Sequence, residues 1–308
     1  MQPSYLGLYR KGELSNRLNR LLDVLKSCNL CPHECGVNRI EGKTGFCKIG
    51  RKARVAGCNA HFGEESPLVG KKGSGTIFLS SCNLRCHFCQ NYEISHHREG
   101  VDVETKDLAA MMLELEKRGC HNINFVTPTH VVPQLLEALV IAAGKGLSVP
   151  LVYNCGGYEK VETLKILDGI FDVYMPDFKF WDNRWSKKYC EVEDYRERAK
   201  AAIKEMHRQV GDLLTDDRGI AIRGLIIRHL VMPNKVAGTS EVMEFIAQEI
   251  SKNAYVNIMD QYRPCGDVVE DTIIHRRLTS DEYRDAVESA RNAGIMRLDP
   301  RERARLFF

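Results

Sequence analysis

Residues 76–95, TIFLSSCNLRCHFCQNYEIS, are the starting point for predicting the fold. Residues 76–79 form a short apolar run, which predicts a buried strand. Cys82, Cys86 and Cys89 follow it with the spacing C-x3-C-x2-C. Iron-sulfur clusters held by cysteine alone normally take four thiolates, so a four-iron cluster on this loop keeps one iron open to a small ligand. An open iron indicates chemistry rather than plain electron transfer.

The octapeptide CNLRCHFC at 82–89, with Phe88 just before its last cysteine, resembles the cluster loop of the radical S-adenosylmethionine (SAM) superfamily. In that superfamily the open iron holds the amino and carboxylate groups of SAM. An electron from the cluster then cleaves SAM to methionine and a 5′-deoxyadenosyl radical. The resemblance implies a 4Fe-4S cluster, SAM as cofactor, and a place for Phe88 near the adenine. Zinc sites mostly pair cysteines as C-x2-C, and ferredoxins use C-x2-C-x2-C, so both alternatives fit this spacing less well.

Composition narrows the class of protein. The chain has 308 residues, 44% of them apolar, and a net charge of +3 with both signs mixed along it. No basic stripe indicates nucleic-acid binding, and no leader or apolar stretch of membrane-spanning length is present, so we expect a cytoplasmic protein without membrane contact. The twelve cysteines cluster at metal-ligand spacings, which favours metal binding over disulfides.

A second group of cysteines lies in residues 28–47, with the spacing C-x2-C-x3-C-x11-C among turn-forming residues. Such loop-rich segments bury little apolar surface, so a metal commonly supplies their folding energy. A zinc ion or another mononuclear metal is the favoured prediction, and an auxiliary iron-sulfur cluster is the alternative. His33 and Cys58 are further candidate ligands. The four expected ligands are Cys28, Cys31, Cys35 and Cys47.

Strand and helix patterns alternate from residue 76 onward, which predicts a parallel sheet with helices outside. Six units cannot close as an eight-unit barrel does, so we expect an α/β fold with an open, partial (β/α)6 barrel. Radical SAM enzymes resemble this arrangement, with the cluster at the mouth of the barrel. We expect a helix and metal-binding cysteine module at 1–75 and the barrel at 76–308. The expected strands are 76–79, 122–126, 149–153, 171–175, 224–231 and 255–259.

Polar residues after the second and third strands are candidate SAM contacts. Most of the superfamily has a G-G-E segment after the second strand, and this chain has TPTH at 127–130 instead. Thr127 and His130 are therefore the expected substitutes for the contact with the amino group. Asn154, after the third strand, can hydrogen-bond the carboxylate or ribose, although Asn in a glycine turn is an equal alternative.

The later strand ends supply the remaining candidates. Asp177 and Lys179 resemble the Asp-x-Lys segment of glycyl-radical-enzyme activases, in which the lysine contacts SAM; a surface ion pair is the alternative. His229 and Asn257 follow as further expected SAM contacts. Cys265 is the catalytic candidate, because a thiol on a mouth loop can contact substrate or carry a hydrogen atom, although a lone cysteine is usually inert.

These motifs together resemble the pyruvate formate-lyase activating-enzyme branch, within an activase-like subgroup that has an N-terminal cysteine module. The resemblance implies a hydrogen-atom abstraction, with a glycyl residue of a partner enzyme as the substrate. It also implies an electron donor such as flavodoxin or ferredoxin. Two alternatives stay open: a radical SAM enzyme that modifies a small molecule or peptide, and a non-catalytic iron-sulfur or zinc scaffold that binds a partner protein.

Overall fold

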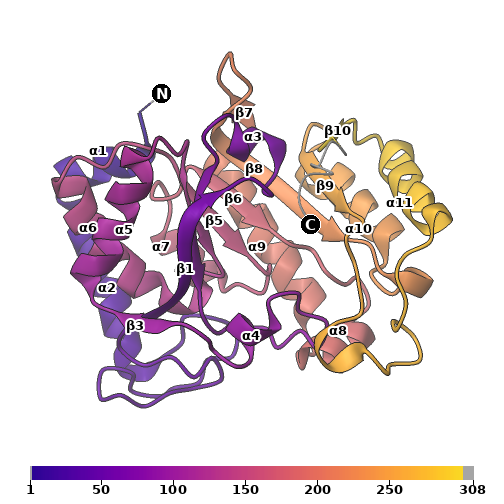
Figure 1. Cartoon of the computed structure of the whole chain (residues 1–308), viewed down its shortest axis with the longest axis horizontal. Helices are drawn as coiled ribbons and strands as arrows, with labels where there is room; N and C mark the ends of the chain where they lie inside the picture. The colour runs from indigo at the N-terminus through magenta and orange to yellow at the C-terminus, as the bar shows by residue number, and fades with distance from the viewer. Residues whose placement is uncertain (1, 301–308) are drawn as a thin grey trace.

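The computed structural model describes residues 2–300, and a sheet of parallel strands forms its centre (Figure 1). Six parallel strands lie side by side in the order in which they occur in the chain. The terminal strands of the whole sheet, β3 and β10, do not pair with each other in the strand order, so the barrel is open. The predicted α/β fold with a partial barrel is confirmed. The six strands are β2 (Ser74–Leu79), β4 (Ile123–Val126), β5 (Leu151–Cys155), β6 (Val173–Pro176), β8 (Ala221–Leu230) and β9 (Tyr255–Met259).

Further strands extend the sheet on both sides. On one side, β1 (Ala53–His61) pairs antiparallel with β2, and β3 (Val101–Val103) pairs antiparallel with β1. On the other side, β10 (Arg297–Leu298) pairs parallel with β9, and β7 (Leu214–Thr215) pairs antiparallel with β8. The segment before residue 75 therefore contributes a strand to the sheet of the barrel, while the expected boundary at 75 stays a prediction.

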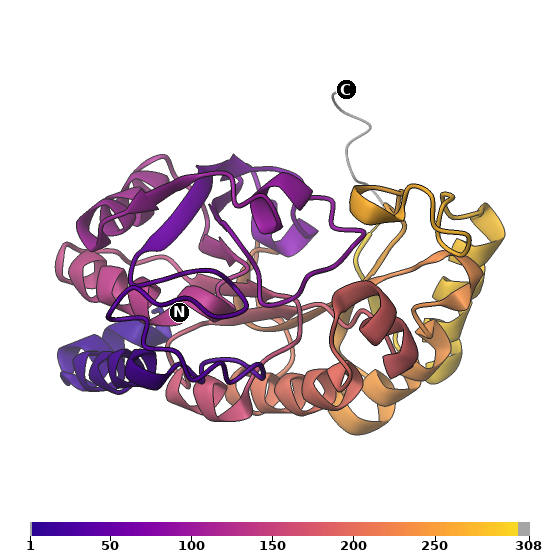
Figure 2. The same cartoon turned by 90° about the horizontal axis from the view of Figure 1, so that it is seen from below.

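Helices connect the parallel strands and cover the outside of the sheet. Figure 1 shows α1, α2, α5 and α6 gathered at one end of the molecule and α10 and α11 at the other, and Figure 2 shows the same separation from below. The longer helices are α2 (Glu13–Val24), α5 (Thr105–Lys117), α6 (Val132–Gly144), α9 (Tyr195–Val210) and α11 (Ser280–Ala293). The shorter ones are α1 (Ser4–Arg10), α3 (Ser66–Val69), α4 (Tyr92–Ser95), α7 (Val161–Ile166), α8 (Asn183–Cys190) and α10 (Thr239–Phe245), which continues as a π turn at Ile246–Ile250.

Side chains along each strand alternate between the inside of the barrel and the helices, as the pleat requires. On β8, Ile226 packs with Val173 in a small apolar cluster, whereas Leu225 and Ile227 belong to the large core shared with the helices. The next position on the face of Ile226 is Arg228, which lies at the mouth of the barrel. The alternation therefore decides which residues at a strand end reach a ligand.

The search for membrane-spanning helices gave a negative result for residues 2–300. No helix there combines the length and the apolar character that crossing a bilayer requires.

Candidate active site

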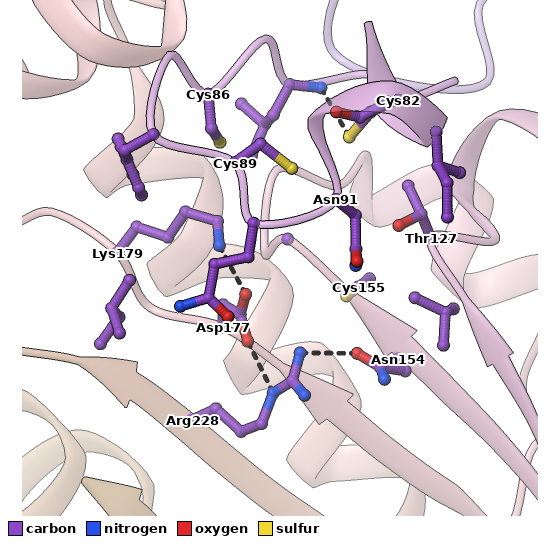
Figure 3. A pocket seen from close by; sticks show the side chains of 18 of the residues that line it. Cys82, Cys86, Cys89, Asn91, Thr127, Asn154, Cys155, Asp177, Lys179 and Arg228 are labelled. Atoms are coloured by element: carbon purple, nitrogen blue, oxygen red, sulfur yellow. Dashed lines mark hydrogen bonds and ion pairs between the residues drawn. The ribbon is translucent and has the colours of Figure 1, made fainter. Parts of the chain in front are cut away.

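A cavity of about 240 Å³ lies at the carboxyl ends of the parallel strands (Figure 3). All six strands, or the positions directly after them, contribute lining residues, and the loop that follows β2 forms the facing wall. This is the edge at which α/β barrels place their reactive groups. The cavity is therefore the candidate active site.

Cys82, Cys86 and Cys89 all line this cavity, as Figure 3 shows. The backbone N–H of Leu84 donates to Cys82 Sγ at 3.2 Å, which holds one sulfur in place. Within residues 2–300 no set of three or more His, Cys, Asp or Glu side chains is arranged as a ready-made metal site, so cluster binding requires the thiols to turn toward a common point. Three thiols on one wall of a cavity fit a 4Fe-4S cluster with one iron left open.

A fourth thiol stands behind this loop. Cys190 is fully buried at the end of α8, and its Sγ lies 3.3 Å from Cys86 Sγ. This hydrogen bond holds the pKa of Cys86 below its usual value, whereas burial raises the pKa of Cys82 and of Cys89. Neither the contact nor α8 is foreseen from the sequence, because Cys190 is far from the loop along the chain.

A charged network faces the cysteines across the cavity. Asp177 accepts hydrogen bonds from Lys179 Nζ at 2.5 Å and from Arg228 Nε at 2.7 Å, and Arg228 Nη2 donates to Asn154 Oδ1 at 2.7 Å (Figure 3). Burial by itself raises the pKa of Asp177, but Arg228 and Lys179 outweigh it, so that the pKa is lowered and the carboxylate stays ionised. The three charged side chains are 11% to 18% exposed, and part of each faces the cavity. Asp177 and Lys179 are therefore part of a buried network and not a surface pair.

Arg228 is a cavity residue that the sequence analysis did not select. It directly precedes the expected contact His229, and alternation along β8 turns the two side chains to opposite faces. Ile226 and Arg228 share the inner face of the strand, so counting by two from an inward apolar residue was the available signal.

Phe88 and Thr127 also line the cavity. The ring of Phe88 is packed edge to face against Phe180, with centroids 5.8 Å apart, so its position is fixed by aromatic packing. Thr127 has φ +61°, a conformation that a β-branched residue rarely adopts, and its N–H donates to Asn154 O at 2.8 Å. Strained backbone of this kind concentrates at functional sites, which supports the selection of Thr127.

Two histidines expected at the cavity lie elsewhere. His229 faces the helices, where Nδ1 contacts Phe178 O at 2.7 Å and Nε2 contacts Thr239 Oγ1 at 2.9 Å. His130 has Nε2 at 2.9 Å from Ser80 O and lines a different, smaller cavity. The expected placement of both side chains toward SAM is therefore corrected: strand alternation turns His229 away, and the turn at Thr129–Val131 turns His130 away.

The last two candidates are also outside the lining of the cavity. Asn257 is buried deeper in the barrel, where its Nδ2 donates to Glu65 Oε1 at 2.6 Å. The thiol of Cys265 donates to Phe88 O at 3.2 Å, so it holds the backbone of the cluster loop and does not point toward a substrate. Both placements differ from the expectation that these side chains face the mouth.

The four N-terminal cysteines come together around a second cavity, as expected from their spacing; they are Cys28, Cys31, Cys35 and Cys47. Cys58 is not among them, because it lies on β1 against α5. His33 has Nε2 engaged with Asn83 O at 2.8 Å and its ring stacked on Phe46. The additional ligand roles considered for Cys58 and His33 are not supported by these positions.

The family model described as the radical SAM superfamily matches residues 76–231, just over half of the chain. The chain belongs to the radical SAM superfamily. It is 36% identical over 278 residues to an uncharacterized protein of Methanocaldococcus jannaschii, and the alignment covers 87% of this chain and 75% of that protein.

Solved structures of radical SAM enzymes resemble the fold. HydG, a maturase of the FeFe-hydrogenase, is similar with a TM-score of 0.50 and 14% identity over 71% of this chain and 49% of that chain. The structure of anSMEcpe with bound AdoMet has a TM-score of 0.47 and 12% identity over 71% of this chain and 61% of that chain. Each match spans less than two thirds of the other protein, and the likeness to HydG concerns the fold alone.

Membership in the superfamily establishes the general chemistry. Radical SAM enzymes catalyse radical reactions with a 4Fe-4S cluster and SAM, and both cofactors follow for this chain from the family. The three-thiol wall and the charged network opposite it suit these two cofactors.

Proposed function

We propose that this protein abstracts a hydrogen atom from a glycyl residue of a partner enzyme, as an activase-like member of the superfamily. The observation that carries the proposal is the shared cavity: the three thiols of the cluster loop and the Asp177, Lys179 and Arg228 network line opposite walls of one space. The distance between them is filled in the enzyme by SAM, which must touch both the open iron and the protein.

The cysteine loop and the strand ends divide the work of binding. Cys82, Cys86 and Cys89 would hold the cluster, which supplies the electron for reductive cleavage of SAM. Each cleavage consumes one electron from outside, and reduced flavodoxin or ferredoxin is the proposed source. The protein contributes position and exclusion of water, and its residues do not supply the electron.

The charged network suits the two ends of the methionine moiety. Lys179 and Arg228 are cations that pair well with a carboxylate, and Asp177 and Asn154 offer oxygens to an ammonium group. Because Asp177 joins the two cations, it fixes both before SAM arrives and reduces the ordering cost of binding. Glu65 lies behind Arg228 at 4.0 Å and extends the network into the barrel.

The mouth of the cavity favours a peptide segment as the substrate. Its exposed lining residues are the carboxamides Gln90, Asn91 and Gln261. Gln90 Nε2 donates to Gln261 O at 2.9 Å, which joins the cluster loop to the loop after β9. Carboxamides both donate and accept hydrogen bonds, as the backbone of a peptide does. A glycyl residue has no side chain that would block its approach to the cavity.

The test uses the reconstituted, reduced protein with SAM and peptides that carry glycine deuterated at the α carbon. The proposal predicts deuterium in the 5′-deoxyadenosine, and predicts none with a matched peptide that carries deuterium only in an alanine methyl group. Formation of 5′-deoxyadenosine without deuterium from any glycyl peptide would point to a small-molecule substrate. Absence of all cleavage, with a full cluster and a strong reductant, would favour the scaffold.

A further inference from the structure

A second cavity of about 10 Å³ lies among the N-terminal cysteines. That volume is close to the space of a single water molecule, so the cavity has room for one ion and not for a four-iron cluster. Its lining includes the four thiols together with Arg39 and His130; the thiols belong to Cys28, Cys31, Cys35 and Cys47.

Arg39 brings a buried positive charge to this cavity. Its side chain is 1% exposed, and it donates to Gly50 O at 3.0 Å and toward Cys28 Sγ at 3.7 Å. In the part of the chain that the structure describes, none of its hydrogen bonds goes to a carboxylate. A buried guanidinium needs negative charge nearby, and the thiols are the groups in contact that can supply it as thiolates.

His130 brings a lone pair that nothing in the described residues satisfies. The side chain is 1% exposed, and Nδ1 has no hydrogen-bond partner while Nε2 contacts Ser80 O at 2.9 Å. Donation from Nε2 to that carbonyl leaves Nδ1 as an acceptor on a neutral ring. A buried acceptor without a donor is costly, and a cation in the cavity would remove that cost.

The surrounding chain needs a covalent or metal staple. Residues 28–52 contain no helix or strand, and they hold their shape through turns and a few backbone hydrogen bonds. The N–H of Phe46 points at Cys35 Sγ at 3.4 Å, and a methyl group on Gly45 would lie 2.6 Å from the same sulfur. Backbone this close to a sulfur leaves space only for glycine and stabilises charge on that sulfur.

From these observations we infer that the four cysteines bind one divalent ion of the zinc class, and that this ion holds the active-site loop in position. The ion displaces one proton from each thiol and forms a complex with a net charge of −2, which Arg39 partly neutralises. The donor atoms are not gathered at one point in the structure, so the thiols rotate inward on binding.

Three contacts connect this module to the loop that carries the catalytic cysteines. Ser81 Oγ donates to Cys47 O, and His33 Nε2 lies 2.8 Å from Asn83 O. His130 Nε2 contacts Ser80 O from the same side. Residues directly before and after Cys82 are therefore fixed by the module, and this positioning role, unlike the metal site, rests on the proposed function.

The experiment is zinc, iron and sulfide counting on the full chain, purified and reconstituted without oxygen. We expect about one zinc per chain in the wild type and in a Cys82→Ala, Cys86→Ala, Cys89→Ala variant, and loss of zinc in Cys31→Ser and in Cys47→Ser. Cys58→Ser is the matched control, since this thiol lies outside the cavity, and it should keep its zinc. Cobalt exchanged into the wild type should give thiolate-to-cobalt charge-transfer bands, a readout that depends on no variant.

Two results would overturn the metal site. One is retention of about four irons and four sulfides by the variant without the three loop cysteines, which would make the module a cluster site. The other is wild type without zinc and without a cobalt spectrum. Neither result depends on SAM cleavage, so failure of the metal site and failure of the proposed function are separate outcomes.

The contribution of His130 and the positioning role have their own readouts. His130→Phe should weaken zinc binding by about 10- to 100-fold in a competition assay, as loss of an outer-shell partner typically does. Zinc-free Cys47→Ser should hold less iron on the intact loop than Cys58→Ser does. Equal iron content in these two variants would refute the positioning role.

Discussion

Cys190 donates to the sulfur of Cys86, and this contact has a consequence for the cluster. A hydrogen bond to a ligand sulfur stabilises the more negative, reduced cluster and so raises its reduction potential. Cys190→Ala should therefore lower the midpoint potential of the bound cluster by about 20 to 60 mV, which corresponds to one hydrogen bond. An electron paramagnetic resonance titration against potential measures the shift. Cys155→Ala is the control, because that buried thiol interacts with Glu159; an equal shift in both variants would contradict the assignment.

Glu159 makes the stability of the protein depend on pH. Burial raises its pKa from 4.5 to about 7, although Thr129 and Tyr153 donate hydrogen bonds to it. As pH rises from about 4.5 to about 7, the unfolded chain releases this proton first, so the native state loses stability relative to it. Glu159→Gln cannot ionise. The loss of unfolding free energy between about pH 5 and about pH 8 should shrink by roughly 3 kcal/mol in this variant. Urea unfolding at both pH values tests this, and the same pH dependence in both proteins would refute it.

At the residue scale, sequence reasoning placed those cavity residues that have a local signal. The three loop cysteines have a diagnostic spacing, and Asn154, Asp177 and Lys179 directly follow predicted strands. Cys190 has no such signal, because its approach to the loop depends on how α8 packs. The partners of His130 are equally non-local, since they come from a loop 50 residues away in the sequence.

The two faces of β8 separate ligand binding from stability. Arg228 faces the cavity and its neighbour His229 faces the helices, with both ring nitrogens engaged. Arg228→Gln should weaken SAM binding by about 10- to 100-fold, the usual range for a lost hydrogen bond to a charged group. His229→Phe should instead lower the free energy of unfolding by about 1–3 kcal/mol, because Thr239 and the carbonyl of Phe178 lose their partner.

Calorimetry with SAM on the cluster-loaded variants, together with urea unfolding, measures both effects. Weaker SAM binding in the His229 variant, with no change in the Arg228 variant, would show that the inner face of the strand has been assigned wrongly.

At the scale of elements, hydrophobic patterns predicted the six parallel strands well because each is a buried apolar run. The edge strand β1 was expected only as short pieces, since its burial is partial and its sequence is mixed. Helix α8 was missed because its polar, aromatic and charged residues show no simple apolar stripe. Its importance comes from tertiary contacts that no local pattern contains.

For the whole molecule, the partial barrel explains why one cavity collects residues from the entire chain. Parallel strands end at one edge, so side chains distant in sequence meet there, and an open barrel leaves space for a cofactor between strand ends and the cluster loop. The fold was predictable from the number of alternating units, whereas the metal in the N-terminal module was left open. The sequence has the ligands, but the size of the cavity that they surround is a property of the folded chain.

The central claim is that the loop of Cys82, Cys86 and Cys89 holds a cluster that cleaves SAM. It is tested most directly by anaerobic reconstitution of the wild type and of the variant with all three cysteines changed to alanine. Iron and 5′-deoxyadenosine are measured in the same samples with SAM and a strong reductant. We expect 5′-deoxyadenosine from the wild type, and loss of about four irons and of all cleavage in the variant. Unchanged iron content, with no cleavage by either protein, would contradict the account.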